Sequence, residues 1–342
     1  MKLSIILPAY NVGSYIERCI RSLADQDVSK NEYEIIVTND GSPDNVSDIV
    51  KNLQKEFSNL VLIDQENQGV SMARNNAIHI AKGSYIMPID PDDYVEPNSF
   101  KDIFKILEEN DLDCLFLKVQ KIDNEFNIVW ETDYSEYTGK INTSLIPFHE
   151  TKGENVLLGD PDRSTAVLFK KSIIEKFNTY YPKDVPFLED GIFIAKYLSV
   201  ARNYMLLDGD FYWRTIREGS ATNSDLFSSR IARIGYLNGL DDLYSFLVKN
   251  KENILDLERE AFLKQMYIHF SILPIIAAIN AKDLKAYLKQ IKLLKGKVKK
   301  VSLEGLRNPY DLYGKAFFFS PIAFSIVYIL KTISQIIKRK FS

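Results

Sequence analysis

The chain has 342 residues, of which 46% are hydrophobic and 26% charged, so it has the composition of a globular protein with room for about two domains. Cys19 and Cys114 are its two cysteines and neither has a motif partner, which disfavours a disulfide framework and favours a reducing, cytoplasmic setting. The N-terminal apolar run is broken at Pro8 and is too short for a signal peptide, so we do not expect export.

The net charge of −3 hides an uneven distribution along the chain. Residues 282–342 hold 14 Lys and Arg against three acids, a balance of +11, whereas the preceding 281 residues hold 29 basic and 43 acidic residues, a balance of −14. A basic tail on an acidic body indicates that the tail meets an anionic partner, either nucleic acid or a lipid surface.

Strand and helix patterns alternate in the first third of the chain. Apolar runs predict strands at residues 3–7, 34–38, 61–63 and 85–89. Helical periodicity follows each strand, at residues 14–23, 49–57, 69–81 and 97–107. Ser14 with Glu17 predicts a capping box for the first helix, and Pro97 predicts the start of the fourth. This series predicts a parallel sheet with helices on both faces and right-handed crossovers.

Three acids, Asp90, Asp92 and Asp93, follow the strand at 85–89. They lie at the C-terminal end of a parallel strand, where open α/β sheets bind their ligands. Clustered carboxylates raise each other's pKa unless a cation neutralises them, and oxygen ligands of this kind suit Mg²⁺ or Mn²⁺. The segment therefore predicts a divalent metal site, with an Asp-rich turn as the alternative.

Asp40 follows the strand at 34–38 in the same way, so Asp40 and Asp90 are expected to face one crevice. An Asp in this place suits a hydrogen bond from a ribose hydroxyl or a base N–H, and a tight turn at residues 39–42 is the alternative. The G-x-G-x-x-G fingerprint and the P-loop pattern do not occur, which disfavours a dinucleotide dehydrogenase and a P-loop NTPase.

The middle of the chain carries two further polar groups. Residues 123–155 predict a long excursion or lid that faces an acceptor. Glu189 and Asp190 precede a helical pattern, so helix N-capping is the alternative to a catalytic role. Strand patterns at 204–207 and around Phe211 predict two strands before Arg214. The planar guanidinium of Arg214 suits a diphosphate, and the alternative is a hairpin with exposed arginines.

Helical periodicity replaces the strand signals from residue 224 onward. Helices are predicted at 226–248 and 258–281, and neither is expected to span a membrane because neither has roughly 20 uninterrupted apolar residues. An apolar stretch at 316–330 precedes a basic amphipathic end, a pattern typical of a peripheral contact in the membrane plane. The alternative is a helix that packs in the core or forms an oligomer.

Four segments together resemble a known family. They are Pro8-Ala-Tyr-Asn11, Thr38-Asn-Asp-Gly-Ser42, Asn67-Gln-Gly-Val-Ser-Met-Ala-Arg-Asn75 and Asp90-Pro-Asp-Asp93. In order and spacing they are similar to the successive motifs of the family 2 glycosyltransferases, which have a GT-A fold. The resemblance covers about the first 90 residues, and it implies a Rossmann-like, mostly parallel α/β sheet flanked by helices.

The resemblance also implies roles for individual residues. The base and ribose would contact Pro8, Tyr10, Asn11 and Asp40. The nucleotide and diphosphate would contact Asn67, Gly69 and Arg74. The DxD motif maps on Asp90 and Asp92, with Asp92 as metal ligand and Asp93 in support. Further along the chain, residues 186–193 resemble the Glu-Asp pair of the family, which implies Asp190 as the catalytic base, positioned by Glu189. Residues 212–220 are similar to the Tyr-x-Arg…Gly-Ser segment that closes over the diphosphate, which implies Arg214 and Ser220, and also Arg217.

These observations predict a GT-A domain over residues 1–223, with a donor half to about residue 110, and an α-helical C-terminal region over 224–342. The predicted activity is inverting transfer of a hexose or N-acetylhexosamine from a nucleotide sugar, with UDP as the expected nucleotide and Mg²⁺ or Mn²⁺ as cofactor. The expected acceptor is a glycan, free or on a polyprenyl diphosphate, at the inner face of a bacterial cell membrane.

Capsule, exopolysaccharide or O-antigen synthesis is the expected setting, and nucleic acid is not an expected partner. The oligomeric state is not predicted. Two alternatives remain: a nucleotidyltransferase of similar architecture, disfavoured because a Gly- and Lys-rich N-terminal loop is lacking, and a nucleotide-sugar-binding protein without transfer activity, disfavoured by Asp190.

Overall fold

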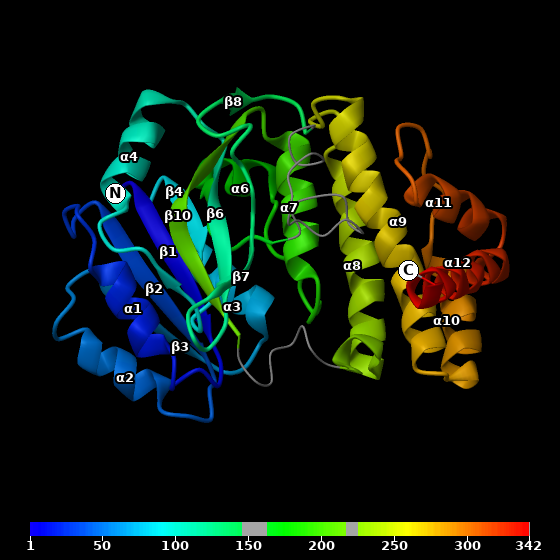
Figure 1. Cartoon of the computed structure of the whole chain (residues 1–342), viewed down its shortest axis with the longest axis horizontal. Helices are drawn as coiled ribbons and strands as arrows, with labels where there is room; N and C mark the ends of the chain where they lie inside the picture. Colours follow the sequence, from blue (N-terminus) through cyan, green and yellow to red (C-terminus); the bar gives the residue numbers. More distant parts are fainter. Residues whose placement is uncertain (146–162, 217–224, 342) are drawn as a thin grey trace. The chain divides into compact units, whose positions relative to one another are not determined.

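The structure, a computed structural model, describes residues 1–145, 163–216 and 225–341 (Figure 1). The chain divides into two compact units, Met1–Lys183 with Val200–Ser220 and Asp184–Ser199 with Ala221–Ser342. This division differs from the boundary at residue 223 that the sequence indicates, because Asp184–Ser199 packs with the second unit.

The first unit begins with the alternating series that the sequence predicts. Its elements are β1 (Leu3–Ala9), α1 (Ile16–Ala24), β2 (Tyr33–Asp40), α2 (Val46–Leu53), β3 (Leu60–Gln65), α3 (Val70–Ile80) and β4 (Tyr85–Pro88). The strands lie in the order β3-β2-β1-β4 and all neighbours are parallel. Their C-terminal ends therefore share one edge of the sheet.

The rest of the first unit extends this sheet with mixed pairing. Its elements are β5 (Tyr94–Val95), α4 (Phe100–Glu109), β6 (Cys114–Ile122), β7 (Ile128–Glu131), β8 (Ile141–Asn142), β9 (Val167–Lys170), α6 (Lys171–Phe177) and β10 (Tyr204–Thr215). Strand β9 is antiparallel to both β4 and β6, whereas β10 is parallel to β6 and antiparallel to β5. The mostly parallel sheet flanked by helices confirms the predicted fold class.

One apolar core fills the space between the sheet and the helices α1, α2 and α4. Leu3, Ile5 and Leu7 of β1 are fully buried there, together with Ile20 of α1 and Phe100 of α4. Side chains alternate along a strand, and a right-handed crossover from β3 to β4 places α3 on the opposite face of the sheet. The sheet is thus buried on both faces, as its continuous apolar strands require.

Three local predictions were wrong. Helix α1 has Tyr15 at its N-cap position without a side-chain cap, because the Val12 carbonyl accepts the Tyr15 and Ile16 N–H groups at 2.9 and 3.0 Å. Helix α4 begins at Phe100 instead of Pro97, since Tyr94–Val95 first pairs with β10. The two strands expected around 204–211 are one strand, β10, with a register shift between Leu207 and Tyr212.

The region expected as a long excursion is partly a β-structure. Within residues 123–145, β7 returns along β6 and β8 pairs with β10, while residues 146–155 lie outside the described residues. The turn before β7 is held by Asp123, whose Oδ1 accepts the Glu125 and Asn127 N–H groups at 2.9 Å each.

The second unit is helical in the residues that the structure describes. Its elements are α7 (Glu189–Val200), the 3-10 helix η2 (Asp225–Ser228), α8 (Arg230–Lys249), α9 (Leu257–Asn280), α10 (Leu284–Lys297), α11 (Tyr310–Phe319) and α12 (Pro321–Phe341). Figure 1 shows the long helices α8 and α9 lying alongside each other. The helical C-terminal region is therefore confirmed.

Helix α9 bears on the expectation that the helix at 258–281 does not span a membrane. By length and composition it could cross a membrane, and among the described residues it alone meets that test. However, 78% of its apolar window is buried inside the structure, which is typical of a core helix. The predicted apolar stretch at 316–330 is divided between α11 and α12, because Ser320 is extended before Pro321.

We predict that Gly83→Ala destabilises the first unit. A Cβ atom at Gly83 would lie 2.4 Å from the Ser4 backbone nitrogen and 2.5 Å from the Leu3 carbonyl carbon, and backbone cannot move aside cheaply. The expected loss of unfolding free energy is about 1–3 kcal/mol. Urea unfolding followed by tryptophan fluorescence measures it, since Trp130 and Trp213 both lie in the first unit.

Gly209→Ala is the matched control, because a Cβ atom at Gly209 meets no heavy atom within 4 Å and neither glycine has a positive φ. We expect the control to change the unfolding free energy by no more than about 0.5 kcal/mol. Equal stability of the two variants would show that the contact of residues 83–84 with β1 is looser than described.

Candidate active site

Asp90, Asp92 and Asp93 lie in a turn directly after β4, at the edge of the sheet where β1 and β2 also end. The Asp93 N–H donates to the Asp90 carbonyl oxygen at 3.0 Å, which closes the turn. The acids therefore occupy the predicted place, and the three side chains have different surroundings.

Asp93 is directed into the protein. It is 2% exposed, its Oδ2 accepts the Tyr212 hydroxyl at 2.5 Å, and its Oδ1 accepts the Thr215 N–H at 2.8 Å. Burial, followed by the negative charges of Asp90 and Asp92, raises its pKa from 3.8 to about 8. Asp93 thus anchors the turn to β10 and does not present its carboxylate to a ligand.

The main chain at Asp92 is held from two sides. Its carbonyl oxygen accepts the Thr215 hydroxyl at 2.7 Å and the Arg18 guanidinium at 2.9 Å. The Arg18 guanidinium also lies over the Tyr94 ring, 4.8 Å from its centroid. The Asp92 side chain is partly exposed on this fixed backbone.

Arg74 of α3 is paired with Asp90. Its Nη2 lies 3.1 Å from the Asp90 Oδ1, and its side chain is 3% exposed while that of Asp90 is 32% exposed. The guanidinium also lies over the Tyr181 ring, 5.1 Å from the centroid. The pair offsets one of the clustered negative charges and keeps a buried guanidinium beside the partly exposed acids.

Asn75, beside Arg74, fixes the orientation of α3. Its Nδ2 donates to the Tyr181 carbonyl at 2.9 Å, and its Oδ1 accepts the Tyr181 N–H at 3.0 Å. One amide side chain thereby pairs with both backbone groups of a distant residue. This contact holds the turn of α3 that carries Arg74.

The acids fit a metal ion that is shared with a ligand. Among the described residues, no group of three or more His, Cys, Asp or Glu could hold a metal by itself. Mg²⁺ and Mn²⁺ are commonly bound by one or two carboxylates together with substrate phosphates. The partly exposed Asp90 and Asp92 supply such a donor set.

Asp40 lies at the N-terminus of α3. Its Oδ1 accepts the Gln68 N–H at 2.7 Å and the Gln65 side-chain amide at 2.8 Å, and its Oδ2 accepts the Gly69 N–H at 2.8 Å. The carboxylate is 3% exposed and satisfies backbone donors that the helix leaves unpaired. A contact between Asp40 and a nucleotide stays a prediction.

Two loops at the ends of β1 and β2 are tied together. The Ser42 hydroxyl oxygen accepts the Asn11 N–H at 2.7 Å and donates to the Asp44 Oδ1 at 2.6 Å, while the Asp44 Oδ2 accepts the Gly13 N–H at 2.7 Å. Burial raises the Asp44 pKa, but the hydrogen bonds, first from Ser42, lower it below 3.8 on balance. Tyr10 beside these loops is 51% exposed and offers a ring on which a base can stack.

The remaining donor-side residues also lie in the first unit. Pro8 is buried in β1, whereas Asn67 and Gly69 are exposed before α3. A Cβ atom at Gly41 would lie 2.8 Å from the Asn67 backbone nitrogen, so this glycine permits the two loops to approach. Arg214 is partly buried in β10, and Arg217 and Ser220 lie outside the described residues.

Glu189 and Asp190 form the first turn of α7 in the second unit, and both are partly exposed. The helix dipole favours negative charge at this end, so the position suits a structural role as well as a catalytic one. Their catalytic roles stay predictions.

Sequence reasoning missed four residues that organise the site: Arg18, Asp44, Tyr212 and Thr215. Tyr212 and Thr215 flank Arg214 in a segment already recognised, but strand alternation alone does not say which side chain reaches Asp93. Asp44 had a signal, because Ser-Pro-Asp before a helix is typical of a side chain that binds loop N–H groups. Arg18 had none, since a charged residue on an exposed helix face usually stays in solvent.

Comparison with known proteins gives relatives among bacterial glycosyltransferases. The poly(ribitol-phosphate) beta-N-acetylglucosaminyltransferase TarS of Staphylococcus aureus is 28% identical over 229 residues, which are 66% of this chain and 37% of TarS. The uncharacterized glycosyltransferase EpsJ of Bacillus subtilis is 33% identical over 214 residues, 61% of this chain and 59% of EpsJ. The chain thus spans less than two thirds of the length of these relatives.

Solved structures show the same fold. The crystal structure of S. aureus TarS 1-349 in complex with UDP-GlcNAc matches with a TM-score of 0.57 and 21% identity, over 89% of this chain and 95% of that one. The predicted GT-A fold is thereby confirmed. The model of the family described as "Glycosyl transferase family 2" matches residues 4–177, just over half of the 342 residues. The chain therefore belongs to glycosyl transferase family 2.

Proposed function

We propose that this chain transfers a sugar from a UDP-sugar to a hydroxyl group of a cell-envelope glycan, with inversion at the anomeric carbon. The observation that carries the proposal is the turn of Asp90 and Asp92, fixed at the carboxyl edge of the sheet and paired with Arg74. Carboxylates that can share a cation with phosphates, beside a buried arginine, suit a leaving diphosphate.

Two relatives support the choice of donor and acceptor. TarS is named as an N-acetylglucosaminyltransferase acting on poly(ribitol phosphate), and its structure is solved with UDP-GlcNAc. The relative from Bacillus spizizenii, 30% identical over 222 residues, is a poly(ribitol-phosphate) beta-glucosyltransferase. We therefore infer a UDP-linked hexose or N-acetylhexosamine as donor and a hydroxyl-rich envelope polymer or its lipid-linked precursor as acceptor.

The mechanism follows from the chemistry of direct displacement. Asp190 takes the proton from the acceptor hydroxyl, and Glu189 positions Asp190. Arg74 and Arg214 stabilise the charge that develops on the leaving diphosphate. Asp92 and Asp90 would hold a Mg²⁺ or Mn²⁺ ion, which supplies further charge neutralisation to the diphosphate when it is bound.

The proposed location is the cytoplasmic side of the cell membrane. The acceptor class and the basic C-terminal tail, whose lysines suit anionic lipid headgroups, support this location. Capsule, exopolysaccharide and teichoic acid synthesis are the pathways that fit, since each builds an envelope polymer from nucleotide sugars.

The first test uses Asp190→Asn, which separates a transferase from a protein that only binds the donor. If Asp190 is the base, its loss removes the proton acceptor and sugar transfer should fall by about 10²–10⁴-fold. Donor affinity should stay unchanged, because the proposed donor residues lie in the first unit. Radiolabelled sugar transfer and calorimetric UDP titration measure the two quantities.

Glu189→Gln is the matched variant and should reduce transfer less, as expected of a positioning residue. If Asp190→Asn transfers sugar at close to the wild-type rate, Glu189 and Asp190 cap the helix and another residue is the catalytic base.

A second test concerns the metal ion. Asp92→Asn should abolish the gain in UDP affinity that Mn²⁺ produces, because an amide is a far weaker ligand than a carboxylate for a hard cation. Calorimetric titration of UDP with and without Mn²⁺ measures this gain. Asp48→Asn on the exposed start of α2 makes the same chemical change elsewhere and should keep the full gain. A metal-dependent gain that survives in Asp92→Asn would contradict the metal assignment.

A third test uses the raised pKa of Asp93, which is about 8 against an ordinary value of 3.8. Between these values the folded protein holds a proton that the unfolded chain releases, so without metal Asp93 makes the protein less stable as pH rises. Asp93→Asn lacks this effect and should gain stability relative to wild type by up to about 1.4 kcal/mol per pH unit.

Urea unfolding of both proteins in EDTA, repeated from pH 5 to pH 8, measures the difference in unfolding free energy between Asp93→Asn and wild type at each pH. Mn²⁺ together with UDP should weaken the wild-type dependence, because a cation shared by Asp90, Asp92 and the diphosphate offsets the part of the Asp93 pKa shift that comes from repulsion. Parallel pH profiles of the two proteins in EDTA would show that Asp93 is ionised in the folded state at neutral pH.

A further inference from the structure

An open apolar groove of about 380 Å³ lies in the second unit, formed by the end of α9, the start of α10 and the helix α12. Its walls are mainly aliphatic and include Ile279, Leu284, Ile322 and Ile326. Nothing in the proposed sugar transfer uses this groove, and every residue that lines it belongs to one unit.

Tyr287 and Ser325, two of the polar residues that line the groove, are paired with each other. The Tyr287 hydroxyl of α10 donates to the Ser325 Oγ of α12 at 2.9 Å, and this Oγ donates to the Pro321 carbonyl at 2.8 Å. The pairing joins α10 to α12 and leaves few partners for water. A groove of this kind favours an apolar occupant over ordered water.

The rim of the groove exposes apolar side chains that a protein usually covers. Leu284 is 70% exposed, Ile322 57% and Ile326 55%, and the neighbouring Phe319 at the end of α11 is 87% exposed. Single exposed apolar residues are ordinary, but a cluster around an apolar groove marks an interaction site.

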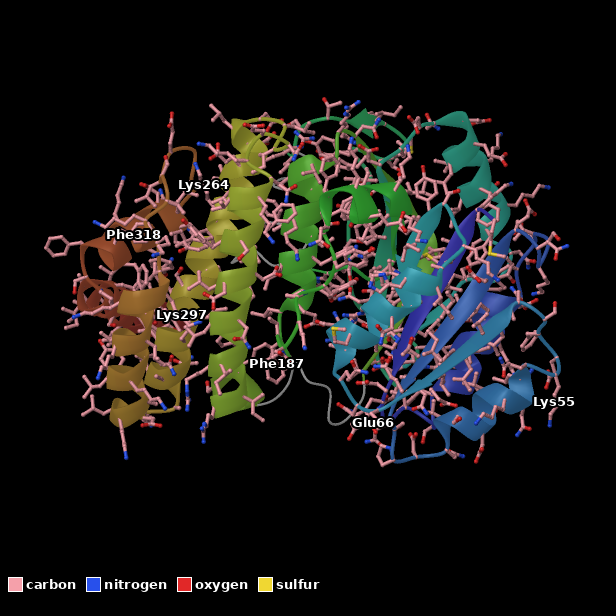
Figure 2. The ribbon with its side chains drawn as sticks, turned by 180° about the vertical axis from the view of Figure 1, so that it is seen from behind. Lys55, Glu66, Phe187, Lys264, Lys297 and Phe318 are labelled. Atoms are coloured by element: carbon pink, nitrogen blue, oxygen red, sulfur yellow. The ribbon has the colours of Figure 1, made fainter. Side chains whose placement is uncertain are left out.

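Positive charge lies at one side of the same groove and on the helix that follows it. Lys282 lines it, and Lys285 and Lys289 follow on α10, all three exposed. Residues 282–300 contain eight Lys and one acid, Asp283, whose Oδ1 accepts the Ala286 N–H at 2.8 Å as the cap of α10. Figure 2 labels Lys297 at the far end of this helix and Phe318 on α11. The charge suits a phosphate at the mouth of the groove.

We propose that this groove binds one acyl chain of an anionic phospholipid, with the lipid phosphate beside Lys282. The size agrees, because an apolar cavity of about 150 Å³ holds the six carbons of benzene, so 380 Å³ holds on the order of fifteen chain carbons. A nucleic acid would leave the aliphatic walls uncovered, and a second copy of this chain would bring lysines against lysines.

This inference goes beyond sugar transfer and does not depend on it. It also goes beyond general attraction of a basic tail to a membrane, because it predicts that one chain enters one groove. Transfer activity in solution and lipid binding can therefore fail or succeed separately.

The first experiment titrates the full chain with monomeric alkyl phosphates of six, eight and ten carbons, below their micellar concentrations, by calorimetry. Burial of each methylene should raise the affinity about fourfold, so that decyl phosphate binds far more tightly than hexyl phosphate. Inorganic phosphate should not bind measurably. An affinity that does not depend on chain length would overturn the proposal.

The second experiment compares two substitutions of the same kind. Ile326→Glu places a carboxylate on the groove wall, and Ile234→Glu makes the same change on α8, where Ile234 is 49% exposed. Because each side chain is about half exposed, both variants should fold, which circular dichroism checks. Ile326→Glu should lose at least tenfold in decyl phosphate affinity, whereas Ile234→Glu should stay within about twofold of wild type.

Sedimentation with vesicles distinguishes binding in the groove from attraction by surface charge. Phosphatidylglycerol in phosphatidylcholine vesicles should sediment wild type and Ile234→Glu, and should sediment Ile326→Glu much less. The double variant Lys285→Glu, Lys289→Glu tests attraction by charge alone. If wild type, Ile234→Glu and Ile326→Glu sediment equally and only the double variant fails to sediment, charge alone explains the binding and the proposed groove site is overturned. Concentration-dependent dimerisation that blocks decyl phosphate binding would make a second copy the occupant and would also overturn it.

Discussion

The hydrogen bond from the Tyr212 hydroxyl to Asp93 is the contact on which the candidate donor site depends. It joins the turn after β4 to the distant strand β10, and Thr215 adds bonds to both Asp93 and the Asp92 carbonyl. A turn with three acids tends to open through repulsion, so it needs an external anchor. Burial of one acid provides this anchor and leaves Asp90 and Asp92 partly exposed at a fixed edge.

Much of the first unit could be predicted from the sequence, because its strands are buried on both faces and read as continuous apolar runs. The parallel order β3-β2-β1-β4 follows from such runs and from short right-handed crossovers. The antiparallel partners of β4 and β6 could not be predicted, since β9 (Val167–Lys170) is short and pairs with strands that are far away in the chain. The same limit applied to β7 and β8, which lie in a region without clear periodicity.

Within the candidate site, the sequence located the acids at the ends of the strands but not the residues that support them. Asp40 and Asp90 were found because they end strands, a position that follows from local pattern. The partner of Asp93 could not be found, because Tyr212 is 119 residues away and the pairing depends on strand register. Glu189 and Asp190 belong to the helical unit by their packing. The sequence does not indicate this division, because its composition does not change near residue 184.

The pair of hydrogen bonds between the Asn75 side chain and the Tyr181 backbone restricts which residues position 75 can accept. The Asn75 side chain offers one donor and one acceptor at the reach that the Tyr181 backbone requires, and both are used. Aspartate has the shape without the donor, and glutamine has the groups one methylene too far away. Position 75 should therefore tolerate very little variation in a randomised library selected only for folding. Engineers who change the residues around Arg74 will have to work from a helix whose rotation is fixed by this contact.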